Sequence, residues 1–124
     1  MALSIRKTAA PKPKVDESRL GFGIHFTDHL FQMDYAPDRG WHNPRIEPYG
    51  PLVLDPATMV LHYGQAVFEG LKAYRTAEGR IQLFRPQDNF KRLNRSNDIL
   101  SIPRIDEAFA LEALKELLRL ERDW

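Results

Sequence analysis

A helix predicted to begin at Pro86 carries the residue best suited to binding an anion. Arg92 stands between Phe90 and Leu93, which places it close to the apolar side of this helix. Its planar guanidinium group matches a phosphate group with two parallel hydrogen bonds. Two interpretations are open. Arg92 either points inward at an anionic group, or covers the edge of the core with the aliphatic part of its side chain. Composition alone favours the position at the edge of the core.

A second candidate is the stretch LHYGQAVFEGLKAYR, residues 61–75, which collects aromatic, acidic and basic side chains around two glycines. The stretch is either a helix that runs into a strand or the wall of an active site. It contains Lys72, and a lysine amine can act as a nucleophile toward carbonyl groups. We expect Lys72 to face solvent from a strand, because exposure is the usual state of lysine.

Two histidines form the third candidate. His25 and His29 are four residues apart, and Asp28 precedes His29, a spacing that could hold a metal on a helix. The surrounding pattern predicts a strand, in which residues four apart lie far from each other along one face. We therefore expect histidines that are satisfied by protein hydrogen bonds, and no metal site. The sequence has no cysteine, which excludes disulfides and thiolate ligands and fits a reducing compartment.

Length and charge narrow the class of protein. The 124 residues are enough for one domain with a buried core. The formal net charge of +1 gives no general attraction to nucleic acid or to an acidic membrane surface. Residues 1–19 contain Pro11, Pro13 and several cations, so we predict a flexible leader, followed by a domain over residues 20–124.

The elements that must position these groups alternate between short strands and helices. In the first half of the chain we predict one or two strands in 21–36, a loop over 37–50 with a turn at 38–40, and a short strand at 51–54. A helix should begin at Asp55, and Gly64 and Gly70 should shorten or break it. We then predict a β-hairpin over 71–85 that turns at 76–79, a helix from Pro86 to about Ser101, and a final helix capped by Asp106. This order predicts an α+β fold, an open α/β small domain, in which helices flank a mostly antiparallel sheet. Ending on Trp124 further suggests a fragment of a longer protein.

The same runs of sequence resemble a known family. The branched-chain amino acid aminotransferases, which are fold-type IV pyridoxal-phosphate enzymes, share the patterns FGIHFTDHLF, WHNPRIEPYGPLVLDPA, LHYGQAVFEGLKAYR and LFRPQDNFKRLNRS. The resemblance extends from about Gly21 to the end of the chain. D-amino acid aminotransferases and aminodeoxychorismate lyases have a similar overall pattern but generally lack the FTDH and PRI.P segments. Two alternatives remain: another fold-type IV enzyme, or a binding module without catalysis.

The resemblance implies a role for four residues. In this family a small N-terminal domain and a larger C-terminal domain hold pyridoxal 5'-phosphate between them. Arg92 falls on the arginine that binds the cofactor phosphate, which reverses the preference that composition suggests. Phe22 and Phe68 fall on aromatic positions that line the apolar substrate pocket, and Tyr63 on a tyrosine that reaches into the pocket of a partner subunit.

The resemblance also implies what the chain lacks. None of its six lysines falls on the position that links covalently to the cofactor, and the carboxylate for the pyridine nitrogen is absent. We therefore assign no catalytic residue here and expect the chain alone to be inactive and to expose its site aromatics. The full enzyme would be a cytoplasmic homodimer that transfers an amino group between leucine, isoleucine or valine and 2-oxoglutarate. We expect no nucleic-acid or membrane partner and no metal.

Overall fold

The computed structural model describes all 124 residues, which divide into two compact units. The first unit contains Met1–Gly50 and Ala113–Trp124, and the second contains Pro51–Glu112. Helix α3 (Glu107–Leu120) contributes residues to both units.

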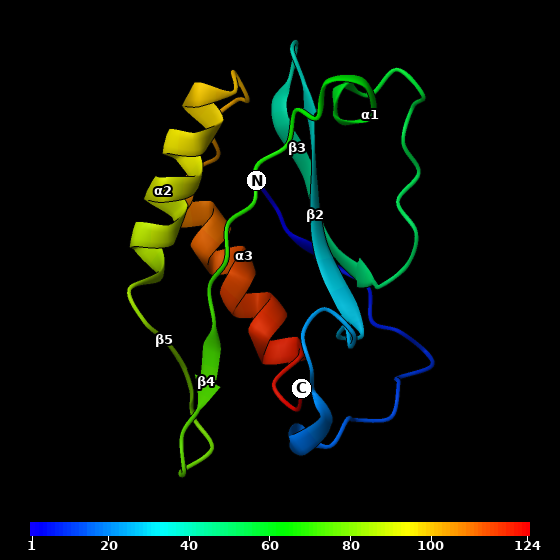
Figure 1. The fold of residues 1–124 in the computed structure, drawn as a ribbon, viewed down its shortest axis with the longest axis vertical. Coiled ribbons are helices and arrows are strands. Elements are labelled where there is room, and N and C mark those ends of the chain that lie inside the picture. Colours follow the sequence, from blue (N-terminus) through cyan, green and yellow to red (C-terminus); the bar gives the residue numbers. More distant parts are fainter. The chain divides into compact units, whose positions relative to one another are not determined.

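A three-stranded sheet forms the first unit, with the strand order β1-β3-β2 (Figure 1). Its elements are β1 (Ser4–Ile5), the short 3-10 helix η1 (Glu17–Arg19), β2 (His29–Ala36) and β3 (Gly40–Pro48). β2 and β3 pair as an antiparallel hairpin, whereas β1 runs parallel to β3. Ile46 on the central strand is fully buried and lies in the core of this unit.

The prediction of a loop over 37–50 is wrong beyond the turn, because β3 occupies most of this range. Proline usually disfavours a central strand, since it has no N–H for the ladder. Here the register shifts between Gln32 and Asp34, so that Asn43 and Pro44 lie together in a bulge. Asn43 takes a left-handed conformation with φ of 52°, which asparagine tolerates better than most residues. The bulge removes Pro44 from the ladder, and the strand continues past it.

The second unit consists of short elements and one long helix. They are α1 (Met59–Tyr63), β4 (Ala73–Arg75), β5 (Ile81–Leu83), α2 (Pro86–Ile99) and the first residues of α3. β4 and β5 form the predicted antiparallel hairpin, and Gly79 in its turn has φ of 77°. The helix from Pro86 is confirmed, and so is the Asp106 cap, whose Oδ1 accepts a hydrogen bond from the Phe109 amide at 3.0 Å.

Two predictions in the second unit are wrong. Residues 51–54 have no strand partner and stay irregular. The next helix begins at Met59, because Asp55 forms a separate turn in which its Oδ1 accepts from the Ala57 amide at 2.7 Å. This helix ends at Gly64 in a left-handed cap, as predicted, and no second helix follows before Gly70.

The leader, which the sequence predicts as flexible over residues 1–19, makes specific contacts. Ser4 and Ile5 pair with β3, and the Arg6 amide donates to the Ile46 carbonyl at 2.9 Å. Two paired residues are too few to show a periodic pattern in the sequence. The extent of leader motion stays a prediction, which hydrogen exchange can measure.

The predicted fold class is confirmed. Helices accompany short sheets whose β2–β3 and β4–β5 pairings are antiparallel, in a small α+β fold. No helix has both the length and the apolar character that crossing a membrane requires.

Candidate functional site

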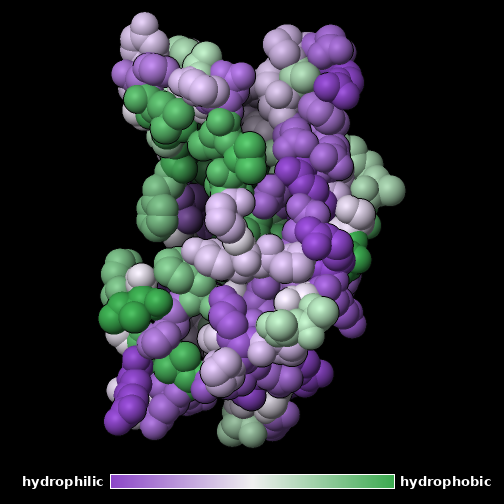
Figure 2. Space-filling view, turned by 90° about the vertical axis from the view of Figure 1, so that its right-hand side faces the viewer, coloured by the Kyte–Doolittle hydropathy of each residue, from purple (hydrophilic) through white to green (hydrophobic).

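Three of the four predicted site residues belong to the second unit. Tyr63 is the last residue of α1, Phe68 lies in the irregular segment before β4, and Arg92 lies in the second turn of α2. Phe22 belongs to the first unit, in a turn before β2. The three aromatic side chains are 96% (Phe22), 89% (Phe68) and 78% (Tyr63) exposed. The expected exposure of these residues is therefore confirmed, and apolar groups form patches on the surface (Figure 2).

Arg92 is held by a carboxylate that the sequence analysis did not identify. Its Nε donates to Oε2 of Glu69 at 2.8 Å, and its Nη2 donates to Oε1 of the same residue. The Glu69 side chain is only 11% exposed, whereas that of Arg92 is 59% exposed. A two-point pair of this kind fixes the plane of the guanidinium group as well as its position.

Asn89 supports the same pair from one turn earlier on α2. Its Nδ2 donates to Oε1 of Glu69 at 3.0 Å and to the carbonyl oxygen of Gly70 at 3.0 Å. Residues three apart on a helix lie on one face, so Asn89 and Arg92 reach the carboxylate together. Both Glu69 oxygens therefore accept hydrogen bonds from α2.

The charges of this pair stabilise each other. The pKa of the Glu69 carboxyl is lowered from 4.5 to about 2, chiefly by the hydrogen bond from Arg92. Burial opposes this shift, and the hydrogen bond from Asn89 adds to it. The hydrogen bond between Arg92 and Glu69 also raises the pKa of the Arg92 guanidinium group. Both groups are consequently ionised throughout the neutral pH range.

One edge of the Arg92 guanidinium group has no protein acceptor. Arginine has five N–H donors, and Glu69 takes one from Nε and one from Nη2. Both hydrogens of Nη1 and the second hydrogen of Nη2 remain. One Nη1 hydrogen and this Nη2 hydrogen point the same way and form the fork that binds an oxyanion with two hydrogen bonds. This donor set fits one contact to a phosphate group such as that of pyridoxal 5'-phosphate.

Spacing in the sequence could not have identified this pair. Glu69 and Arg92 are 23 residues apart, and a hairpin separates them. The available signal was the presence of Glu69 and Arg92 in two of the runs that carry the family resemblance.

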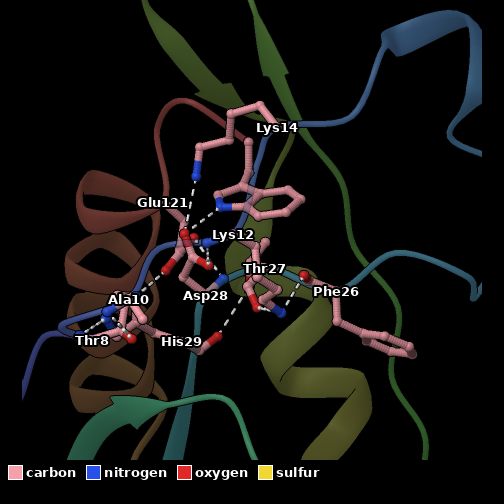
Figure 3. Close-up of polar contacts among 10 residues, drawn as sticks. Thr8, Ala10, Lys12, Lys14, Phe26, Thr27, Asp28, His29 and Glu121 are labelled. Atoms are coloured by element: carbon pink, nitrogen blue, oxygen red, sulfur yellow. Dashed lines mark hydrogen bonds and ion pairs between the residues drawn. The ribbon is translucent and has the colours of Figure 1, made fainter.

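The first unit contains a separate, buried polar cluster around Asp28 (Figure 3). One Asp28 oxygen accepts from the Lys12 amide at 2.9 Å, and the other accepts from Lys14 Nζ and from Trp124 Nε1, both at 3.0 Å. The Lys12 hydrogen bond is the largest cause that holds the pKa of Asp28 well below its usual value. The cluster joins the leader, the start of β2 and the residues after α3.

His29 completes this cluster. Its Nε2 accepts from the Thr8 amide at 2.8 Å, so its Nδ1 carries the proton that it donates to Glu121. The other Glu121 oxygen accepts from the Asp28 amide at 3.2 Å. Both ring nitrogens thus have protein partners, which confirms the interpretation of a satisfied histidine. His25 is exposed and lies outside the cluster, and Lys72 is exposed as predicted.

The chain is a small α+β fold that presents the open donor edge of Arg92 and several exposed aromatic residues. Similar proteins identify the kind of enzyme. The chain is 61% identical over 118 residues to branched-chain-amino-acid transaminase 1 of Bacillus subtilis (strain 168), a match that covers 95% of the chain and 33% of that protein. It is 56% identical over 122 residues to branched-chain-amino-acid aminotransferase 2 of the same strain, covering 98% and 34%.

A more distant relative has the same kind of name. The branched-chain-amino-acid aminotransferase of Mycolicibacterium smegmatis is 50% identical over 104 residues, which cover 84% of the chain and 28% of that protein. No protein-family model matches the chain. The chain spans about a third of the length of these relatives. It corresponds to the N-terminal part of the branched-chain amino acid aminotransferases, which confirms the resemblance.

Proposed function

We propose that this chain is the part of a branched-chain amino acid transaminase that anchors the cofactor phosphate and lines the substrate pocket. The whole enzyme transfers an amino group between leucine, isoleucine or valine and 2-oxoglutarate. The observation that carries the proposal is the identity of 50–61% to three aminotransferases across most of the chain. The open fork of Arg92 supports it, because this donor set suits a phosphate group.

Arg92 binds the phosphate of pyridoxal 5'-phosphate through Nη1 and the outer hydrogen of Nη2. When bound, the cofactor supplies an electron sink for bond changes at the carbon that carries the amino group. The contribution of Arg92 is to bind and orient. A phosphate held at one end of the cofactor restricts the position of the ring where the reaction occurs.

The aromatic residues contribute to substrate selection. Leucine, isoleucine and valine have no polar group on the side chain, so a pocket separates them by shape and burial, at about 1–3 kcal/mol per methylene group. Phe22 and Phe68 provide rigid apolar surface for this pocket. Tyr63 serves the pocket of the partner subunit in a homodimer. Their exposure in this chain leaves all three available for such contacts.

The remaining two-thirds of the enzyme supplies the catalytic groups, including the lysine that links covalently to the cofactor and the carboxylate for the pyridine nitrogen. We assign no catalytic residue to this chain, and we expect no amino transfer by the chain alone. Lys72 is exposed just before β4 and has no assigned role in the reaction. We place the whole enzyme in the cytoplasm as a homodimer.

The test uses a full-length protein in which this chain is continued by the remaining residues of the 61% identical Bacillus subtilis relative. Arg92→Ala should weaken binding of pyridoxal 5'-phosphate by about ten- to a hundredfold, the scale of hydrogen bonds to charged groups. Arg95→Ala removes an exposed cation from the same helix and should leave the affinity unchanged. Equal affinities for wild type and Arg92→Ala would contradict the phosphate role.

A second measurement tests the substrate class. The full-length protein should use leucine, isoleucine and valine as amino donors, and D-alanine poorly. Preference for D-alanine would instead identify another fold-type IV enzyme.

A further inference from the structure

We infer that Glu69 is a positioning residue, which orients the Arg92 guanidinium group for the phosphate, and that Asn89 secures Glu69 in this role. The inference rests on the proposed function of Arg92. It assigns a task to two residues that the family resemblance, as stated above, leaves without one.

The geometry explains how orientation is achieved. A long arginine side chain on an exposed helix surface has many rotamers, and ordering them opposes the binding of any ligand. The two hydrogen bonds to Glu69 select one orientation before a ligand arrives. In that orientation the Nη1 edge of Arg92 faces away from the carboxylate and is the edge open to an oxyanion.

Asn89 fixes the carboxylate in turn. Its Nδ2 donates both to Oε1 of Glu69 and to the carbonyl oxygen of Gly70, so the side chain of Glu69 is tied through Asn89 to the backbone of the next residue. The Glu69 side chain is also largely shielded from water, at 11% exposure. Shielding strengthens these hydrogen bonds relative to a fully solvated pair.

An opposite effect has to be considered, because Glu69 is negative and a phosphate is negative. If Glu69 acted only as a nearby charge, its removal would strengthen phosphate binding. If it acts by orienting Arg92, its removal weakens phosphate binding. The two roles therefore predict changes of opposite sign, and the sign of the measured change decides between them.

The experiment measures the dissociation constant of pyridoxal 5'-phosphate, by fluorescence titration, in the full-length protein described above. Glu69→Ala should weaken binding roughly tenfold, by analogy with the loss caused by removing groups that orient metal ligands. Glu69→Gln, which keeps one carbonyl acceptor, should give an intermediate loss, and Asn89→Ala a smaller one. Glu78→Ala is the matched control, because it removes one glutamate that is paired with an arginine in the same unit, at 3.7 Å from Arg80. Unchanged or tighter binding by Glu69→Ala would overturn the inference.

A second readout separates positioning from a general structural role. Introduced into an Arg92→Ala protein, Glu69→Ala should cause no further loss, because Glu69 acts through Arg92. The phosphorus-31 resonance of the bound cofactor should shift in Glu69→Ala and stay unchanged in Glu78→Ala. If Glu69→Ala fails to fold, Glu69→Gln and Asn89→Ala give the same test with smaller changes of shape.

The outcomes also separate this inference from the proposed function. If Arg92→Ala itself leaves the affinity unchanged, the phosphate role of Arg92 fails. If Arg92→Ala weakens binding while Glu69→Ala does not, only the positioning role fails.

Discussion

The buried cluster around Asp28 in the first unit and the Arg92–Glu69 pair in the second unit differ in how far their charged groups are buried and paired. In the first unit Asp28, His29 and Glu121 are buried, at 6–7% exposure, and their hydrogen-bonding partners come from the chain itself. In the second unit Arg92 has one carboxylate partner, is 59% exposed and keeps an unpaired edge.

This difference separates a structural cluster from a candidate site. Around Asp28, three donors from the chain already satisfy the carboxylate, so a ligand would have to displace them. At Arg92 a ligand would add hydrogen bonds without breaking any. The charged group that the chain leaves incompletely paired is therefore the better candidate for binding.

The largest effect that we predict concerns the core of the first unit. Ile46→Ala should lower the free energy of unfolding by about 3 kcal/mol, because it empties a fully buried site on the central strand. Chemical denaturation monitored by circular dichroism measures the change. Val53→Ala is the control: Val53 is 99% exposed, so its loss should change stability by less than about 0.5 kcal/mol. Equal effects of the two substitutions would remove the distinction between core and surface.

A smaller effect should follow from breaking the buried cluster. Asp28→Ala leaves the Lys12 amide and Trp124 Nε1 without an acceptor, so the melting temperature should fall by several degrees or more. Hydrogen exchange should show that the Thr8 and Lys12 amides lose their protection. Asp16→Ala, which affects only an exposed turn at Ser18, should leave that protection intact. Fast exchange of both amides in the wild type would instead support a flexible leader.

A third prediction concerns how the stabilising effect of the Arg92–Glu69 pair depends on pH. Hydrogen bonding from Arg92 lowers the pKa of Glu69 from 4.5 to about 2, so the pair stabilises the folded state fully above pH 4.5. That contribution is lost as the pH falls from about 4.5 to about 2, where the carboxylate is protonated. Carbon-13 NMR of the Glu69 carboxyl group should therefore show titration near pH 2. In Arg92→Ala the midpoint should rise toward 4.5, and a midpoint near 4.5 already in the wild type would exclude the pair.

Local signals explain why parts of the fold could be predicted. Gly79 allows the hairpin turn, Pro86 starts a helix, Asp106 caps one and Gly64 ends one, each within a few residues of the element that it controls. The site residues Arg92, Phe22, Phe68 and Tyr63 came from family resemblance, and their roles stay predictions.

Contacts between distant residues explain the rest. Trp124 binds Asp28 across 96 positions, and Glu69 binds Arg92 across 23, so no periodic pattern indicates either pair. The strand that contains Pro44 forms because a partner strand and a bulge accommodate a residue that opposes strands locally. Both the formation of β3 and the pairing of Arg92 with Glu69 therefore depend on tertiary contacts.

The smallest effect on stability should come from the exposed aromatic residues, although they have the most specific proposed role. Phe68→Ala should change the free energy of unfolding of this chain by less than about 0.5 kcal/mol, since the side chain is 89% exposed. In the full-length protein the same substitution should change the ratio of kcat/KM for leucine and valine severalfold, because it widens an apolar pocket. Phe84→Ala is the control, since Phe84 is 80% exposed in the same unit and has no assigned role. If both substitutions left the leucine-to-valine ratio unchanged, exposure of Phe68 would be an ordinary property of the surface and its assignment to the pocket would be wrong.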